Sequence, residues 1–388
     1  MAAGPRSYLD HNATGPLRPE AAAAVVRALD LVGNPSSIHA EGRAARAAIE
    51  AAREQVAALV GALSKNVVFT SGGTEAANLV LSPTFRRAGE AGATRLLVGA
   101  TEHPCILAGH RFGAAVETIP VDPDGVVDLA WLERRLAELG ERVLVSIQLA
   151  NNETGTLQPV AEAARLVRAA GGLIHTDAVQ AAGRVAVDMA ALGVDAITLS
   201  AHKLGGPKGV GALVLASDRF EIADRLVRGG GQERGARAGT ENVPGILGFG
   251  AAAEAAKAAL EAEMPRLRRL RDEAESALRR LAADAVVFGV RAERLPNTFA
   301  FAVPGLKAET ALIAFDLAGV ALSSGSACSS GKVAASAVLS AMGVEPALAA
   351  GALRVSLGWN STETDVSRFA EACGRVVDTL YKRRANAA

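Results

Sequence analysis

Apolar and polar positions follow two different periods over the first 243 residues of the chain. Residues 41–63 place apolar side chains three and four positions apart, which predicts an amphipathic helix. Short runs that are apolar or rich in β-branched residues lie at 67–70, 95–99, 142–150, 172–177, 195–200 and 211–216. Such runs are typical of parallel strands that are buried on both faces. Because helical patterns such as residues 160–170 separate several of them, the chain is predicted to form a βαβ series.

The pattern changes near residue 243. A helical stretch rich in Ala, Glu and Arg covers about residues 250–283, and shorter mixed elements follow it. A chain of 388 residues is long enough for two domains. We therefore expect an α/β fold with a large domain of residues 14–255, built on a mostly parallel sheet, and a smaller α+β domain of residues 1–13 and 256–388.

The composition of the chain excludes several classes of protein. The chain holds 41 basic and 41 acidic residues. It therefore lacks the excess of positive charge that is typical of nucleic-acid-binding proteins. The N-terminus lacks the apolar segment of a secretion signal, and no apolar run reaches the roughly 20 residues that a membrane helix needs. The three cysteines, Cys105, Cys328 and Cys373, form no CxxC pair, which favours a reducing compartment over disulfides or structural zinc. We expect a cytoplasmic protein with no metal, membrane or direct nucleic-acid partner.

Candidate chemistry follows three of the predicted strands. In SGGTEA (71–76), the N–H groups at the start of a helix would favour a phosphate, although an ordinary strand-to-helix turn has the same pattern. The strand at 195–200 leads to Lys203, one of only seven lysines; such an amine can bind carbonyl compounds covalently, or can simply be solvated. Asp177 follows the strand GLIHT and would either protonate a heterocyclic nitrogen or cap the next helix.

Each signal is weak alone, but the three lie on successive parts of one βα series. A phosphate cup, an acid for a pyridine nitrogen and, 26 residues later, a strand-end lysine are the parts needed to hold pyridoxal 5'-phosphate (PLP). The combination predicts a PLP enzyme with the fold of aspartate aminotransferase.

A separate signal is the segment SSGSACSSGK (323–332), which places Cys328 among five serines and two glycines. This composition offers little apolar area to bury a thiol, so we expect a mobile loop. A thiolate in such a loop is a nucleophile that can move between two positions.

Ten stretches spread over nearly the whole chain resemble the cysteine desulfurases, a PLP-dependent family related to class V aminotransferases. They are YLDHNAT (8–14), GNPSSIH (33–39), FTSGGTEA (69–76), ATEHPCIL (100–107), NNETGTLQP (151–159), HTDAVQ (175–180), SAHKLGGPKGVG (200–211), GGGQERGARAGTENV (229–243), SSGSACSSGK (323–332) and LRVSLG (353–358). The cysteine segment is similar to that of group I, the branch that serves nitrogen fixation and iron–sulfur cluster assembly. The resemblance implies the PLP-dependent transferase fold, fold type I.

The resemblance also implies roles for individual residues. The catalytic residues would be Lys203, which holds PLP and moves the substrate proton, Cys328, which takes the sulfur, and His103, which stacks on the ring. The other cofactor contacts would be Gly73, Thr74, Asn152, Asp177, Gln180, Ser200 and His202, with Thr240 supplied by the partner subunit of a homodimer. The substrate would be bound by Arg354, which clamps its carboxylate, and by Asn152, Asn12 and Asn34.

The implied activity is conversion of L-cysteine to L-alanine, with the sulfur held on Cys328 as a persulfide for an iron–sulfur scaffold protein or another acceptor. A selenocysteine lyase, or another PLP-dependent lyase or aminotransferase of this fold, would use the same ring-binding residues. A non-catalytic scaffold that keeps the fold is an alternative of a different class. The cysteine segment favours the desulfurase, because transamination has no use for a mobile thiol.

Overall fold

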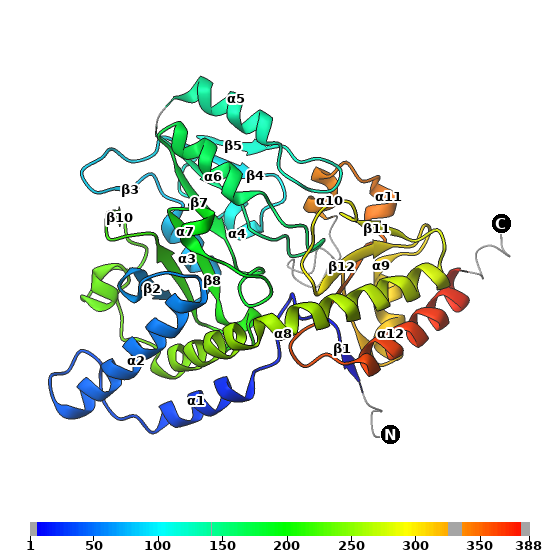
Figure 1. Cartoon of the computed structure of the whole chain (residues 1–388), viewed down its shortest axis with the longest axis horizontal. Helices are drawn as coiled ribbons and strands as arrows, with labels where there is room; N and C mark the ends of the chain where they lie inside the picture. The colour runs from blue at the N-terminus through cyan, green and yellow to red at the C-terminus, as the bar shows by residue number, and fades with distance from the viewer. Residues whose placement is uncertain (1–5, 141, 325–335, 382–388) are drawn as a thin grey trace.

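The computed structural model describes residues 6–140, 142–324 and 336–381 (Figure 1). Its largest sheet has seven strands in the order β2-β9-β8-β7-β6-β4-β5. These strands are β2 (Val67–Thr70), β9 (Gly211–Leu215), β8 (Ala196–Ser200), β7 (Leu173–Asp177), β6 (Val143–Ser146), β4 (Arg95–Gly99) and β5 (Val116–Ile119). Only β9 runs antiparallel to its neighbours, so the other six end at the same edge. The mostly parallel sheet predicted from the sequence is confirmed.

Helices cover both faces of this sheet because successive strand residues point to opposite sides. Leu97, Val145 and Ile197 belong to a core on one face, whereas Leu96 and Leu144 belong to a core on the other. The first core is closed by α1 (Pro19–Leu29), α2 (Ala40–Leu59), α5 (Leu129–Leu139), α6 (Val160–Ala169) and α7 (Met189–Leu192). The second is closed by α3 (Gly73–Val80) and α4 (Pro104–Leu107), beside the two-stranded ribbon of β3 (Phe85–Arg87) and β10 (Phe220–Ile222).

Helix α2 shows why the predicted pattern folds as it does. Its buried side chains include Ala45, Ile49, Ala52 and Val56, spaced four, three and four residues apart. This spacing puts them on one face of the helix, against the sheet and α8. Burial of a side chain such as Ile49 or Val56 stabilises the fold by roughly 1.5–3 kcal/mol.

A second, antiparallel sheet has the order β11-β12-β15-β14. Its strands are β11 (Val286–Phe288), β12 (Thr298–Ala302), β15 (Leu353–Ser356) and β14 (Ser323–Ser324), and β1 (Ser7–Tyr8) pairs with β13 (Val320–Ala321) nearby. The helices of this part are α9 (Ala308–Leu317), α10 (Ala337–Ala341), α11 (Pro346–Ala349) and α12 (Glu363–Val376). Its core holds four phenylalanines whose rings meet in stacked or edge-to-face contacts: Phe299, Phe301, Phe315 and Phe369.

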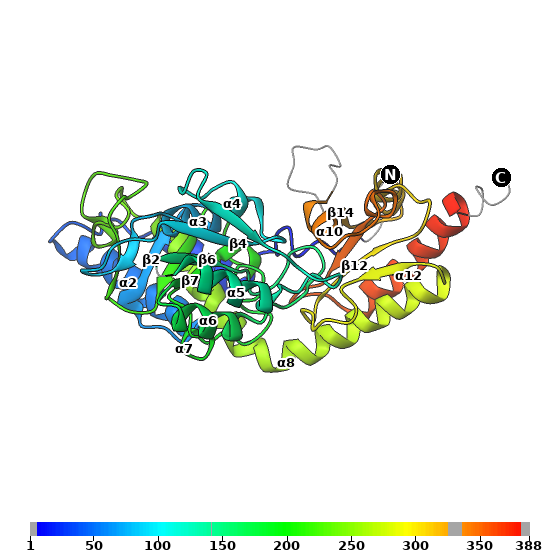
Figure 2. The same ribbon diagram turned by 90° about the horizontal axis from the view of Figure 1, so that it is seen from above.

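The 39-residue helix α8 (Val243–Leu281) joins the two parts. It packs on α1 and α2 in one half and on α12 in the other, and Figure 2 shows α8 running alongside α12 in the small part. The helix passes without interruption through the predicted domain boundary at residues 255 and 256, so that boundary stays a prediction. None of the described helices combines the length and apolar character needed to cross a bilayer. The remaining short turns are η1 (Ser64–Asn66), η2 (Ala201–Lys203), η3 (Gln232–Gly235) and η4 (Val377–Tyr381).

Candidate active site

The carboxyl ends of β2, β7 and β8 bring the predicted chemistry to one edge of the large sheet. Gly211 in β9 is the register partner of both Thr70 and Ser200, so β2 and β8 end at the same level. Strand β7 ends at Asp177 beside them, and η2 continues from β8 to Lys203. Ligands of open α/β sheets bind outside this edge.

Helix α3 begins directly after β2 and supplies backbone donors. Its first internal hydrogen bond runs from the Ala76 N–H to the Gly72 carbonyl, so the N–H groups of Gly73 and Thr74 precede the helical ladder. A Cβ atom on Gly73 would lie 2.9 Å from Cγ2 of Val179, whereas one on Gly72 would meet nothing within 4 Å. The turn therefore packs closely on one side and is open on the other, as an anion cradle requires.

Lys203 points at the N-terminal segment of the chain. Its Nζ donates hydrogen bonds to the carbonyl oxygens of Asn12, at 2.5 Å, and Ala13, at 2.8 Å. The neighbouring His202 forms a hydrogen bond between Nδ1 and the Thr14 hydroxyl, at 3.2 Å. Burial, with a smaller effect of Lys203 and other cations, lowers the pKa of His202 to about 4. His202 is therefore neutral at pH 7 and can serve as a hydrogen-bond donor or acceptor.

Asn12 is buried and connects the two sheets. Its Nδ2 donates to the Asn152 carbonyl at 3.1 Å and to the Thr298 hydroxyl at 2.9 Å, and its Oδ1 accepts from Asn297 at 3.2 Å. Its carbonyl oxygen also accepts from Gln180 Nε2 at 3.0 Å. Both ends of the Asn12 amide are thus engaged within the protein, and its contact with substrate stays a prediction.

Asp177 and His103 lie close enough to influence each other and Lys203. Burial raises the pKa of Asp177, opposed by the Val179 N–H, which donates to Oδ1 at 2.9 Å, and by the charges of His103 and Lys203. Burial likewise lowers the pKa of His103, opposed by the charge of Asp177. His103 Nδ1 accepts the Cys105 N–H at 3.1 Å, so the neutral ring carries its proton on Nε2.

Arg354 forms a fixed cationic wall of the site. It lies in β15 and is only 3% exposed. Its Nη2 donates to Oδ1 of Asp10 at 2.7 Å, and its Nη1 donates to the Asn152 carbonyl at 2.8 Å. Within the described ranges its buried Nε has no hydrogen-bond partner. The guanidinium is thus held in one orientation with donor capacity left.

The predicted nucleophile Cys328 lies outside the described residues, but both flanks of its segment reach this wall. On one side, Ser323 of β14 is the register partner of Arg354. On the other, the Ser336 hydroxyl donates to Oε2 of Glu153 at 2.6 Å, next to Asn152. The segment between these flanks therefore begins and ends beside the site.

Two predicted residues are exposed to solvent in the single chain. Asn34 is exposed in the connection between α1 and α2, where its Oδ1 accepts the Ser36 N–H at 2.9 Å. That connection lies at the far end of the large part from the small sheet (Figure 1). Thr240 is also exposed, two residues before the α8 N-cap Asn242.

Sequence reasoning missed several buried polar residues of the site. Glu102 is 3% exposed and accepts the Gln148 N–H at 2.5 Å, and burial raises its pKa well above the ordinary value. Arg184 bonds to the segments that carry Gln180 and Lys203. Glu102 lies in the stretch TEHP and Arg184 follows QAAG, and neither position belongs to a periodic pattern of apolar residues. Only the tertiary contacts of these two residues reveal them.

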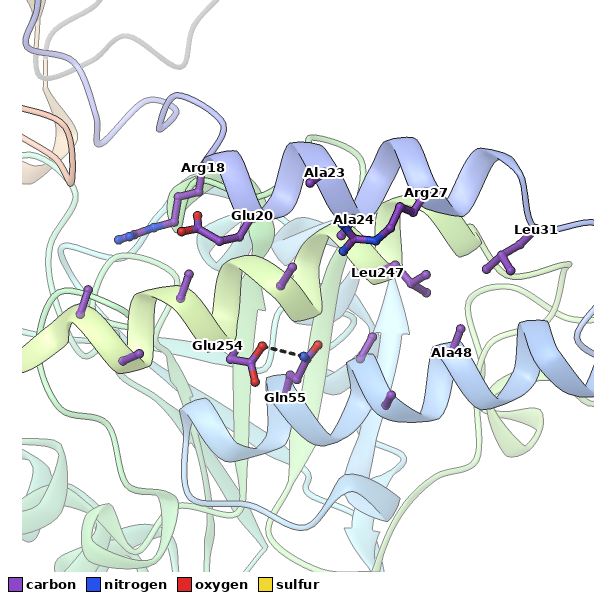
Figure 3. Close-up of a pocket in the computed structure, with 16 residues that line it drawn as sticks. Arg18, Glu20, Ala23, Ala24, Arg27, Leu31, Ala48, Gln55, Leu247 and Glu254 are labelled. Carbon is purple, nitrogen blue, oxygen red and sulfur yellow. Dashed lines mark hydrogen bonds between the residues drawn. The ribbon is translucent and has the colours of Figure 1, made fainter.

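The residues present fit PLP. The open cradle at Gly72 offers backbone donors to a phosphate, and the carboxylate of Asp177 lies at a neighbouring strand end with the amine of Lys203. No group of three or more His, Cys, Asp or Glu side chains within the described part of the chain could hold a metal ion. The large groove of about 1080 Å³ between α1, α2 and α8 is lined mainly by alanines (Figure 3), and none of its lining residues is a predicted site residue.

Comparisons with known proteins identify the family of the chain. The model of the aminotransferase class-V family matches residues 7–369. The cysteine desulfurase IscS of Dictyoglomus turgidum is 40% identical over 378 residues, covering 96% of this chain and 95% of that protein. A cysteine desulfurase of Cereibacter sphaeroides is 43% identical over 383 residues, covering 97% and 96%. The crystal structure of a NifS-like protein from Rickettsia africae superposes with a TM-score of 0.87 at 35% identity, covering 96% of this chain and all of that one.

The fold and the strand-end site thus define a PLP-dependent enzyme of fold type I, and the chain belongs to the aminotransferase class-V family. Within that family it is a member of the cysteine desulfurases.

Proposed function

We propose that the chain removes sulfur from L-cysteine, releases L-alanine and holds the sulfur on Cys328 as a persulfide. The observation that carries this proposal is the position of the two flanks of the Cys328 segment. Ser323 pairs with Arg354, and Ser336 bonds to Glu153, and these positions of the flanks support a role for the Cys328 thiol toward an amino acid held at Arg354.

Within this proposal, PLP supplies an electron sink that makes the α-proton of a bound amino acid removable. Lys203 would hold the cofactor, Asp177 would pair with its ring nitrogen, and the N–H groups of Gly73 and Thr74 would bind its phosphate. Ser200 and His202, which precede Lys203, and Gln180 would make further cofactor contacts, together with His103 and Asn152.

The protein residues have separate tasks toward the substrate. The guanidinium of Arg354, fixed by Asp10 and Asn152, would bind the substrate carboxylate and so orient the α-proton toward Lys203. Lys203 would accept that proton as general base, and His103, whose lowered pKa leaves it neutral at pH 7, would relay protons through Nε2.

The sulfur transfer balances without an external oxidant or reductant. The Cys328 thiolate attacks the substrate sulfur, the Cβ–S bond breaks and an S–S bond forms on Cys328. Cβ keeps the bonding electrons and gains a proton, so one cysteine and one enzyme thiol yield one alanine and one persulfide. An unperturbed thiol is only a few per cent ionised at pH 7, so loss of the thiol proton is a step that the site must assist.

We further propose a cytoplasmic homodimer in which Thr240 and Asn34 of one subunit approach the site of the other. Both side chains are exposed in a single chain, which suits contacts made across a dimer. The sulfur acceptor would be an iron–sulfur scaffold protein or another thiol carrier that approaches the Cys328 segment.

The test is an assay of purified protein with PLP, L-cysteine and a thiol reductant. Alanine and sulfide should appear in equal amounts without any keto acid. Lys203→Ala should abolish both products and the visible absorption of the bound cofactor. Cys328→Ala should keep that absorption but release no sulfide. A requirement for a keto acid would favour an aminotransferase, and normal sulfide release by Cys328→Ala would contradict the role of the thiol.

A further inference from the structure

Arg184 joins three segments of the active site through one buried guanidinium. It follows β7 and is only 7% exposed. Its Nη1 donates to the carbonyl of Gln180, at 2.9 Å, and to Oε1 of the same residue. Its Nη2 donates to the carbonyls of His11, at 3.2 Å, and Lys203, at 3.3 Å. The guanidinium therefore contacts the Gln180 side chain and the backbone on which the catalytic lysine is mounted.

The charge of Arg184 is not balanced by an acid. Within residues 6–140, 142–324 and 336–381 it forms no ion pair, and all its acceptors are neutral oxygens. The buried arginines Arg18 and Arg53, in contrast, each pair with a glutamate, at 3.0 and 2.6 Å. Burial, together with the like charge of Arg354, lowers the pKa of Arg184 to about 9. A buried cation without a counter-ion costs stability, so a structural role alone explains its presence poorly.

The contact with Gln180 fixes the direction of an amide. An arginine only donates hydrogen bonds, so the atom of Gln180 that faces it must be the oxygen. The opposite end is then the NH₂ group, and one of its N–H bonds goes to the Asn12 carbonyl at 3.0 Å. The same carbonyl accepts Lys203 Nζ at 2.5 Å. One N–H of Gln180 remains as a donor beside the catalytic amine.

We propose that Arg184 is a positioning residue with two tasks. It presents the Gln180 amide to the cofactor as a hydrogen-bond donor, and it holds the backbone of Lys203 in a fixed position relative to that amide. This inference rests on the proposed function, because the acceptor for the remaining N–H is an anionic oxygen of bound PLP. Arg184 touches neither cofactor nor substrate in this scheme and acts through its two neighbours.

The test compares PLP binding by wild type, Arg184→Met, Arg184→Lys and Gln180→Glu. Apo-protein is titrated with PLP, and the dissociation constant, the visible absorption maximum and its pH midpoint are measured. Arg184→Met should bind PLP about tenfold more weakly or worse, the effect of losing an oriented hydrogen bond to a charged group, and should shift the pH midpoint. Arg184→Lys keeps the charge and should recover part of the affinity.

Gln180→Glu separates positioning from folding. A glutamate keeps a partner for Arg184 and adds the missing counter-charge, but it cannot donate to the cofactor. The variant gains an ion pair with Arg184 but loses the N–H that Gln180 donates to the Asn12 carbonyl. It should remain folded, as its unfolding transition shows, and still bind PLP weakly. Arg271→Met is the control, because Arg271 is a buried arginine of α8 that donates to the Leu295 carbonyl at 2.7 Å and pairs with Asp272 at 2.7 Å. It should lower the unfolding temperature without changing the visible spectrum.

The outcomes distinguish this inference from the proposed function. If wild type takes up no PLP, the proposed function falls and the inference falls with it. If wild type binds PLP and Arg184→Met or Gln180→Glu keeps the wild-type affinity, spectrum and pH midpoint, the positioning role is wrong while the proposed function stands.

Discussion

The carbonyl oxygen of Asn12 receives hydrogen bonds from both Lys203 Nζ and Gln180 Nε2, so one backbone atom orients two residues of the site. The Asn12 side chain meanwhile reaches Thr298 in the small sheet. A shift of this asparagine would therefore disturb the catalytic amine and the contact between the two sheets together. The site depends on the N-terminal segment as much as on the strand ends.

Sequence motifs located the strand-end residues because their chemistry follows local patterns. Asp177 and Lys203 each come directly after a buried apolar run, and the parallel sheet places the ends of such runs side by side. The bond between Asn12 and Asn297 could not be predicted, since 285 residues separate the two and neither lies in a periodic pattern. Arg184 gave no signal either, because its role depends on burial.

The buried His175 leads to a pH prediction. Burial lowers the pKa of His175 to about 3, whereas the pKa of a histidine in the unfolded chain is about 6.5. Between these values the unfolded state binds more protons, so the free energy of unfolding falls as the pH falls through this window. His175→Asn should reduce that slope by about 1.4 kcal/mol per pH unit. Urea unfolding of apo-protein at several pH values measures it, and an unchanged slope would contradict the buried neutral imidazole.

At the scale of elements, the β14–β15 pair and the start of α10 set the two ends of the cysteine segment. The Ser336 hydroxyl caps α10, accepting the Leu339 N–H at 3.0 Å, and donates to Glu153 at 2.6 Å. Glu153 lies one residue after Asn152, whose carbonyl binds Arg354. A single helix cap thus connects the cysteine segment to the wall that would bind the substrate carboxylate.

Weakening this connection should slow sulfur transfer without affecting the cofactor. We expect Ser336→Ala to keep the PLP absorption and affinity but to form the Cys328 persulfide several-fold more slowly, since α10 loses its cap, worth about 1 kcal/mol, and the anchor to Glu153. Rapid quenching and mass spectrometry measure the persulfide. Ser340→Ala, at an exposed serine of the same helix, is the matched control. Persulfide formation at the rate of that control would show that the anchor has no role.

At the scale of the whole molecule, α8 keeps the large and small sheets at a fixed spacing while the site lies between them. The lysine comes from one sheet and Arg354 from the other, so neither part alone contains the complete set of residues. The exposed positions of Thr240 and Asn34 extend this argument to the proposed dimer.

Mixed dimers test whether Thr240 acts across subunits. Lys203→Ala and Thr240→Val should each be inactive alone, the second through loss of cofactor affinity. After unfolding and refolding together, half the dimers are mixed, and each has one site with both native residues. Activity should recover to about a quarter of wild type. No recovery, with mixed dimers demonstrated by native mass spectrometry, would place Thr240 in the site of its own chain or outside it.

The most direct test of the central claim is a single turnover with limiting L-cysteine and no reductant. The account predicts one alanine per cysteine consumed, no sulfide in solution, and one added sulfur atom that peptide mass spectrometry locates on Cys328. Alanine formed with the sulfur on Cys105 or Cys373, or released as free sulfide by a protein whose Cys328 stays unmodified, would contradict it.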